Sequence, residues 1–132
     1  MLATTLSFDS RERLDEFARM LQQVIDRHDV LRTAVLWEGL PEPVQVVWRK
    51  AQLLVEEVQL DAVDGEIAER LLKRFDPRQV RMDVRQAPLM HLAIAQDVPK
   101  ARWVVLVRFH HLVVDHLILI IMLLLKNMDI IL

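Results

Sequence analysis

The chain has 132 residues, which fits one domain or one lobe of a larger domain. Hydrophobic residues make up 53% of it and charged residues 27%, a composition that excludes an intrinsically disordered chain and predicts a packed core. The net charge of −2 gives no electrostatic basis for binding nucleic acid, and the lack of cysteine excludes disulfides and thiolate metal sites.

The first residues predict a strand followed by a long helix. A strand is expected over residues 2–8, and Asp9 stands three residues before Glu12, a spacing typical of a capping box at a helix start. Apolar residues then recur at helical spacing, at Leu14, Phe17, Ala18, Leu21, Val24 and Ile25. This opening has neither the basic start nor the apolar stretch of a signal peptide, so we expect a cytoplasmic location.

The middle of the chain predicts a hairpin, a further strand and a second helix. Branched residues favour strands over 30–37 and 44–48, with Gly and Pro between them as turn residues. Another strand is expected over 55–60. Helical spacing over 65–75 predicts a helix that ends before Pro77.

Two more strands and an apolar helix complete the chain. The strands are expected over 89–95 and 102–109, and an apolar run over 117–125 follows. A membrane-spanning helix needs about 20 apolar residues, so the run predicts a buried helix and no membrane partner. His91 and the tryptophans are expected to be structural, in the core or on a sheet face; the tryptophans are Trp37, Trp48 and Trp103.

The mixture of strands and helices predicts an α/β fold, more narrowly an α+β sandwich. Hairpins alternate with helical segments, which argues against a pure βαβ repeat. No linker long enough to separate two domains occurs, so residues 1–132 are expected to form a single unit.

Histidines and an acid gather directly after the last predicted strand, at His110, His111, Asp115 and His116. Imidazole titrates near neutral pH and suits proton transfer to or from an amine or hydroxyl group, and a nearby carboxylate orients the ring or fixes the loop. A zinc or iron(II) site made by His111, Asp115 and His116 is an alternative. No glutamate-bearing zinc motif accompanies it.

A second cluster, over residues 27–33, follows the long predicted helix and reads Arg-His-Asp-Val-Leu-Arg-Thr. Basic groups at a helix carboxyl end complement the helix dipole, which by itself explains Arg27 and His28.

Together the two clusters resemble motifs of one family. Residues 27–33 are similar to the RHExLRT motif and residues 110–115 to the HHxxxDG motif of nonribosomal peptide synthetase condensation domains, in the same order. The segments 42–47 and 86–89 are also similar to that family. The resemblance covers nearly the whole chain, as the N-terminal lobe of such a domain.

The resemblance implies a chloramphenicol-acetyltransferase-like fold and an acyltransferase activity in antibiotic-type peptide synthesis. The implied reaction is amide bond formation between an acyl or peptidyl thioester and an aminoacyl thioester, each bound to a carrier protein. It implies no cofactor of its own and no metal, because the substrates are carried on phosphopantetheine. The expected partners are therefore peptidyl and acyl carrier proteins.

The resemblance also assigns roles to single residues. His111 is the catalytic histidine, as base or as positioner of the amine, and His110 supports it. Asp115 is implied to form a structural ion pair with Arg27, or alternatively with Arg32. His116 stands where the motif has glycine, so it is expected to narrow the substrate channel or to add a titrating group.

The family's complete domain has two similar lobes with the site between them, and the second lobe is absent from this sequence. We therefore expect the chain to be incomplete as an enzyme and its apolar helix, residues 117–132, to be covered by the missing lobe or by self-association. Two other classes stay open. One is a coenzyme A-dependent HxxxD acyltransferase, and the other is a non-catalytic fragment or interaction module.

Overall fold

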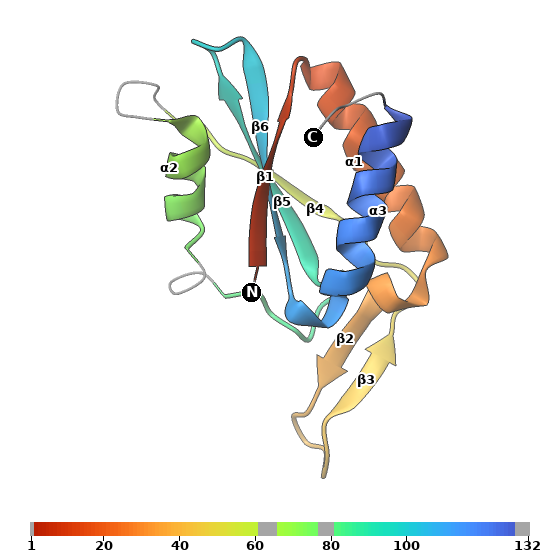
Figure 1. Ribbon diagram of the computed structural model, residues 1–132. Helices are drawn as coiled ribbons and strands as arrows, with labels where there is room; N and C mark the ends of the chain where they lie inside the picture. Colours follow the sequence, from red (N-terminus) through yellow and green to blue (C-terminus); the bar gives the residue numbers. More distant parts are fainter. Residues whose placement is uncertain (1, 61–65, 77–80, 129–132) are drawn as a thin grey trace.

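A four-stranded sheet forms the centre of the chain, in the order β1–β6–β5–β4 (Figure 1). The computed structural model describes residues 2–60, 66–76 and 81–128, and for residues 114–117 it describes the backbone alone. The strands of the sheet are β1 (Leu2–Phe8), β4 (Leu54–Glu57), β5 (Met90–Asp97) and β6 (Arg102–Phe109). Strand β6 runs antiparallel to both β1 and β5, and β4 runs parallel to β5.

Helices cover both faces of this sheet. Helices α1 (Arg11–Arg27) and α3 (Val114–Asn127) lie on one face, and α2 (Ile67–Arg74) lies on the other (Figure 1). Successive strand side chains point to opposite faces. Val105 and Val107 therefore pack in the core with α1 and α3, whereas Val104 and Leu106 pack with α2. The predicted α/β sandwich is confirmed.

Helix α1 follows the predicted amphipathic pattern. Its apolar stripe is fully buried at Leu14, Phe17, Leu21 and Ile25. The predicted start at Asp9 is wrong by one residue, because the hydroxyl of Ser10 caps the helix by accepting the backbone N–H of Arg13 at 3.2 Å.

The hairpin consists of β2 (Thr33–Leu36) and β3 (Val44–Val47) and projects away from the sheet (Figure 1). The strand predicted over 30–37 starts later than expected, because Asp29–Arg32 forms a 3-10 turn, η1. The expectation that Trp37 and Trp48 belong to the core or a sheet face is wrong, since both lie outside the hairpin strands and are 43% and 44% exposed.

The remaining strands of the sheet match the prediction to within a few residues. The strand expected over 55–60 spans 54–57 and the one expected over 89–95 spans 90–97, whereas 102–109 has the predicted bounds. Trp103, on β6, is half-buried, and the guanidinium of Arg11 lies 4.8 Å from the centre of its ring.

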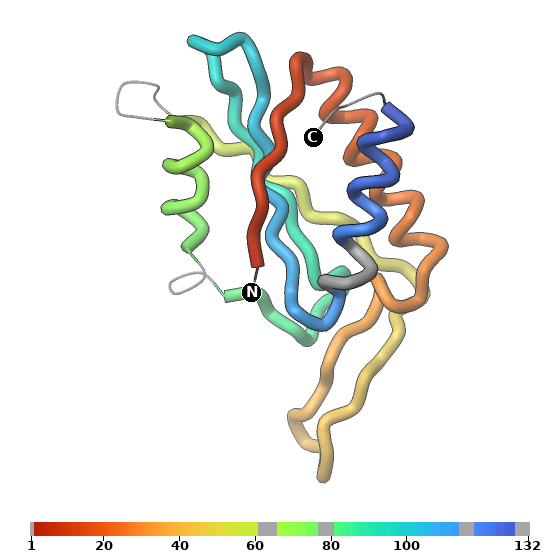
Figure 2. Tube along the Cα trace, in the orientation of Figure 1, coloured from red at the N-terminus to blue at the C-terminus, as the bar shows by residue number. Residues whose placement is uncertain are grey.

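Helix α3 runs antiparallel to α1, back along the same face of the sheet (Figure 2). The prediction of a buried helix holds for one side only, where Ile121, Leu124 and Leu125 enter the core. The opposite side is apolar but exposed, at Ile118, Leu119, Met122 and Leu123. We call these four residues the outer face of α3.

In the part of the chain that the structure describes, no helix has the length and apolar character needed to cross a membrane.

Candidate functional site

The turn between β6 and α3 carries the histidine cluster. Strand β6 ends at Phe109, a 3-10 turn, η2 (His111–Val113), follows, and α3 continues directly from it. His110 occupies the corner of this turn. Its backbone N–H donates to the carbonyl of Leu89 at 2.9 Å, and its own carbonyl accepts the N–H of Val113 at 3.1 Å. The corner is therefore fixed to the sheet on one side and to the helix on the other.

The side chains of the two histidines differ in exposure and in bonding. The ring of His110 is half-buried, and its Nδ1 accepts the backbone N–H of Leu112 at 3.2 Å. His111 is exposed at the first position of η2. The two ring centres are 6.2 Å apart and the ring planes meet at 79°. His111 is thus the more exposed of these two histidines.

Burial lowers the pKa of His110, and the neighbouring His111 acts in the same direction. The neutral imidazole is therefore the favoured form at physiological pH. A neutral ring is also the form that the hydrogen bond requires, because Nδ1 accepts a hydrogen bond from the Leu112 N–H only when Nδ1 itself carries no proton.

Asp115 and His116 belong to the first turn of α3 by their backbone, four and five positions after His111. Their side chains lie outside the described residues. The predicted ion pair of Asp115 with Arg27, the alternative with Arg32, the channel role of His116 and the alternative metal site all involve these side chains, so they stay predictions. Among the residues that the structure does describe, no group of three or more histidine, aspartate or glutamate side chains is arranged to hold a metal ion.

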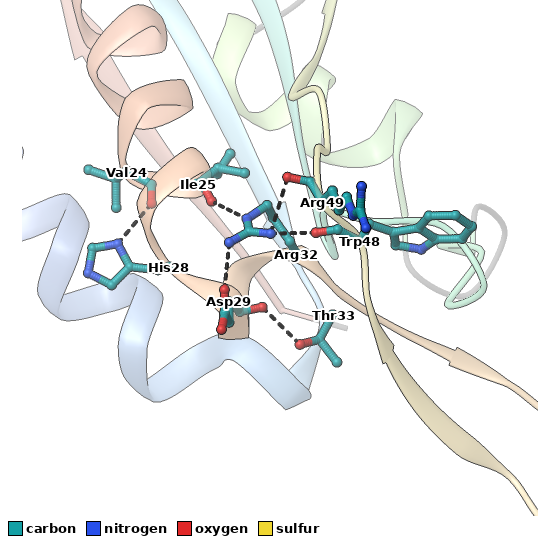
Figure 3. Close-up of polar contacts among 8 residues, drawn as sticks. All are labelled: Val24, Ile25, His28, Asp29, Arg32, Thr33, Trp48 and Arg49. Atoms are coloured by element: carbon teal, nitrogen blue, oxygen red, sulfur yellow. Dashed lines mark hydrogen bonds and ion pairs between the residues drawn. The ribbon is translucent and has the colours of Figure 1, made fainter.

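The second motif forms a clamp around the guanidinium of Arg32, which is only 8% exposed (Figure 3). Nε donates to the carbonyl of Ile25 at 3.0 Å, Nη2 binds Asp29 Oδ1 at 2.6 Å, and Nη1 donates to the carbonyls of Trp48 and Arg49. This one side chain therefore joins the end of α1, the turn η1 and the chain leaving β3. We call these contacts the Arg32 clamp.

The other residues of this motif form further hydrogen bonds between the end of α1 and the start of β2. His28 Nδ1 donates to the carbonyl of Val24 at 2.8 Å, and the hydroxyl of Thr33 donates to the carbonyl of Asp29 at 3.1 Å (Figure 3). Arg27 is the last residue of α1 and is exposed. Figures 1 and 3 both show the first turns of α3 beside the end of α1, so the two motifs lie at the same end of the fold.

An apolar pocket of 350 Å³ is lined by Phe109, the last residue before the histidine turn, but by none of residues 110–113. It lies between β1, the end of β6 and α3, and its lining includes Leu2, Phe109, Ile118 and Met122. A larger hollow of 540 Å³ lies elsewhere, against Gln22, Asp26 and residues 49–52, and contains no residue of the histidine turn.

A buried arginine on the α2 side was not foreseen. Arg108 is 5% exposed, and its guanidinium lies 4.5 Å from the ring centre of Phe75. Its Nη2 approaches His91 Nδ1 at 3.5 Å. Burial, followed by the charge of Arg108, lowers the pKa of His91, and Glu56 opposes this in part. The charge of Arg108 within the otherwise apolar end of the β6 sequence was the signal that could have indicated this buried arginine. His91 has the structural position that was predicted.

We expect the chain to lose stability when the pH falls from about 7.5 to about 5. In the unfolded state His91 and His110 titrate near pH 6.5, and folding lowers both pKa values. The unfolded state therefore binds more protons as the pH drops, which favours unfolding. The stability linked to these two histidines is fully present above about pH 6.5. It is lost as the pH falls through their lower pKa values in the folded state.

Urea unfolding across this pH range checks the prediction, with His91→Gln as the comparison. Glutamine keeps a polar side chain but does not titrate, so the variant should show a weaker loss of stability on acidification. A pH dependence that is unchanged in His91→Gln would contradict the role of His91.

The family model described as "Condensation domain" matches residues 1–124. The chain is 48% identical over 113 residues to malpinin synthetase of Mortierella alpina, covering 86% of this chain and 1% of that protein. It is 30% identical over 97 residues to gramicidin S synthase 2 of Brevibacillus brevis, covering 72% of this chain and 2% of that protein. The chain therefore spans a small fraction of the length of the curated relatives that it matches.

Solved structures of related domains superpose on this chain. The starter condensation domain of rhizomide synthetase superposes with a TM-score of 0.60 at 23% identity, over 83% of this chain and 27% of that one. The epimerization domain from the third module of tyrocidine synthetase B superposes with a TM-score of 0.62 at 25% identity, over 83% of this chain and 25% of that one. The fold is thus that of about one quarter of these structures, which have the chloramphenicol-acetyltransferase-like architecture.

Proposed function

The chain belongs to the condensation domain family of nonribosomal peptide synthetases, and on this premise we propose that it carries the histidine half of a site for amide bond formation. The donor is an acyl or peptidyl thioester on one carrier protein, and the acceptor is the amine of an aminoacyl thioester on another. The amine nitrogen attacks the thioester carbonyl, the C–N bond forms, the C–S bond breaks, and the amine proton ends on the released thiol.

The observation that carries this proposal is the exposure of His111 on the turn after β6. A base or a hydrogen-bond acceptor for an amine must lie within about 2.6–3.2 Å of it or one water away, so its ring has to be open to a ligand. His111 meets that condition, whereas His110 uses its Nδ1 within the turn. We therefore assign to His111 the proton acceptance or the positioning of the attacking amine.

Asp115 is proposed to act on structure rather than on the reaction. A carboxylate in the first turn of α3 complements the positive end of the helix dipole, and an arginine partner would fix the turn further. Arg27 is the better candidate, because the guanidinium of Arg32 is engaged in its clamp. His116, in place of the motif glycine, is proposed to narrow the channel beside this turn.

The other walls of the site are proposed to come from the part of the domain that this chain does not match, because the chain covers only 27% and 25% of the solved condensation and epimerization domains. We propose that the second lobe covers the outer face of α3 in a complete domain, and that a second copy of the chain covers it when the chain is alone. Exposed apolar patches of this kind are uncommon on monomers.

We accordingly expect the isolated chain to self-associate at tens of micromolar. The double variant Leu119→Glu with Leu123→Glu should weaken association by at least about 100-fold, because each leucine contributes about 1.5–3 kcal/mol when it is fully buried. Light scattering coupled to size exclusion measures this. Asn127→Glu, an exposed polar position on the same helix, is the control. A monodisperse native monomer would contradict the prediction.

A condensation assay tests the proposed function. Donor and acceptor carrier proteins are loaded with their thioesters, and dipeptidyl product is measured with the chain alone, with the chain plus a separately supplied second lobe, and with that lobe alone. Product is expected only with both parts. Transfer from a free coenzyme A thioester without a carrier protein would instead favour the coenzyme A-dependent class, and no product in any combination would favour a non-catalytic fragment.

A further inference from the structure

We propose that His110 is the positioning residue of the site: its imidazole caps the turn η2 through Nδ1 and thereby holds His111 in its presenting conformation. This inference rests on the proposed function and goes further, because it gives a defined atomic task to the first histidine of the pair. It concerns the tautomer and the hydrogen bond of one ring, so it can be tested apart from catalysis.

The geometry is that of a helix N-cap. The first backbone N–H groups of a helical segment have no partner within it, and a capping side chain accepts one of them, usually the second or third. With His110 as the residue before η2, Leu112 is the second position, and its N–H points to His110 Nδ1 at 3.2 Å. The carbonyl of His110 accepts from the third position, Val113, at 3.1 Å.

Asparagine, aspartate, serine and threonine are the usual residues for this task, because each carries an acceptor close to the backbone. Imidazole Nδ1 occupies the same bonded position as the Oδ1 of asparagine, two bonds beyond Cβ. It accepts a hydrogen bond only in the neutral tautomer that carries its proton on Nε2. The half-buried setting of the ring favours that neutral state.

The cap acts on His111 through the backbone. His111 is the residue between the capping ring and the amide that it binds, so the bond from His110 Nδ1 to Leu112 closes a small loop around it. Loss of this bond leaves the turn held by backbone contacts alone and widens the range of directions in which the His111 ring points. Misplacement of a catalytic group by about 1 Å can cost about 100-fold in rate.

Three substitutions separate this role from others. His110→Asn keeps an acceptor at the Nδ1 position, His110→Gln keeps a polar group only near the Nε2 position, and His110→Leu keeps neither. Hydrogen exchange of the Leu112 amide is measured by NMR on the 132-residue chain. Exchange is expected to be unchanged in the Asn variant and roughly fivefold faster or more in the Gln and Leu variants, as for the loss of a cap.

The condensation assay with the second lobe supplies the functional readout. His110→Asn should retain kcat within about threefold, whereas His110→Gln and His110→Leu should lose about tenfold or more in kcat with little change in KM, because orientation and not binding is affected. A Gln variant that equals the Asn variant in both readouts would overturn the proposal. So would an Asn variant that keeps Leu112 protected but is inactive, since His110 would then act by its Nε2.

The proposed function and the capping role of His110 can fail separately. If the native chain forms no product with a second lobe, the proposed function fails, and the Leu112 exchange series still decides whether His110 caps the turn. If product forms but Leu112 exchange is the same in all variants, the capping role is wrong while the function stands.

Discussion

Replacement of His111 by alanine is expected to lower the rate of amide formation by about 100-fold or more in the two-lobe condensation assay. A positioned general base contributes typically 100-fold to 10,000-fold, and alanine leaves no group that can accept or orient the amine proton. The ring of His111 is exposed on the turn η2, so its removal should leave the folded state nearly intact. Initial rates at saturating carrier proteins measure the effect.

His28→Ala provides the matched control for this prediction. It also removes an exposed histidine, one whose Nδ1 binds the carbonyl of Val24 at the end of α1. We expect the control to change the rate less than about threefold, because the ring is engaged with the helix and not with a substrate. Product formed by His111→Ala at the native rate would remove the catalytic assignment.

Replacement of Arg32 by leucine is expected to lower the free energy of unfolding by about 3 kcal/mol. The guanidinium satisfies the carbonyls of Ile25, Trp48 and Arg49 and pairs with Asp29, and leucine leaves these acceptors without it. Hydrogen bonds to charged groups contribute about 1.5–3 kcal/mol each, and unsatisfied buried acceptors are costly. Water reaching the exposed carboxylate of Asp29 limits the loss at that partner.

Urea denaturation of the native chain and of three variants tests the Arg32 clamp. Arg32→Lys keeps the charge but lacks the planar fork, so it should still lose about 2 kcal/mol. Arg19→Leu, an exposed position on α1, should stay within about 0.5 kcal/mol of the native chain. Full stability of Arg32→Leu would show that the clamp contributes nothing to folding.

The elements that sequence alone predicted well are those with long and regular patterns. The stripe of α1 repeats over several turns, and β6 contains the apolar run 103–107 between two arginines, so both were predicted with nearly their true limits. In such segments the local pattern and the packing of the fold favour the same structure.

Sequence alone failed where a distant partner decides the local structure. Val30 favours a strand by propensity, but residues 29–32 form a 3-10 turn, and the Arg32 side chain at its end bonds to the carbonyls of Trp48 and Arg49. No spacing rule reveals which carbonyl groups a guanidinium will meet across the fold. The placement of Arg108 over Phe75 has the same origin.

Sequence alone predicted some features of the candidate site and missed others. His111 was predicted as the candidate catalytic residue, because its motif and the strand before it can both be recognised in the sequence. The bond from His110 Nδ1 to the amide of Leu112 could not be foreseen, since it depends on the ring orientation in one turn. An apolar helix over 117–132 that needs a covering neighbour was predicted, but which side of α3 packs into the core could not be, because an apolar helix sequence does not tell which side meets a neighbour.

A crystal structure of the complete domain, with a donor thioester mimic and an unreactive acceptor amine mimic bound, tests the central claim most directly. The measured quantity is the distance from the acceptor nitrogen to the nearer ring nitrogen of His111. We expect about 2.6–3.2 Å, or one bridging water. An acceptor nitrogen held by some other titratable group, with the His111 ring covered by protein and out of its reach, would contradict the account.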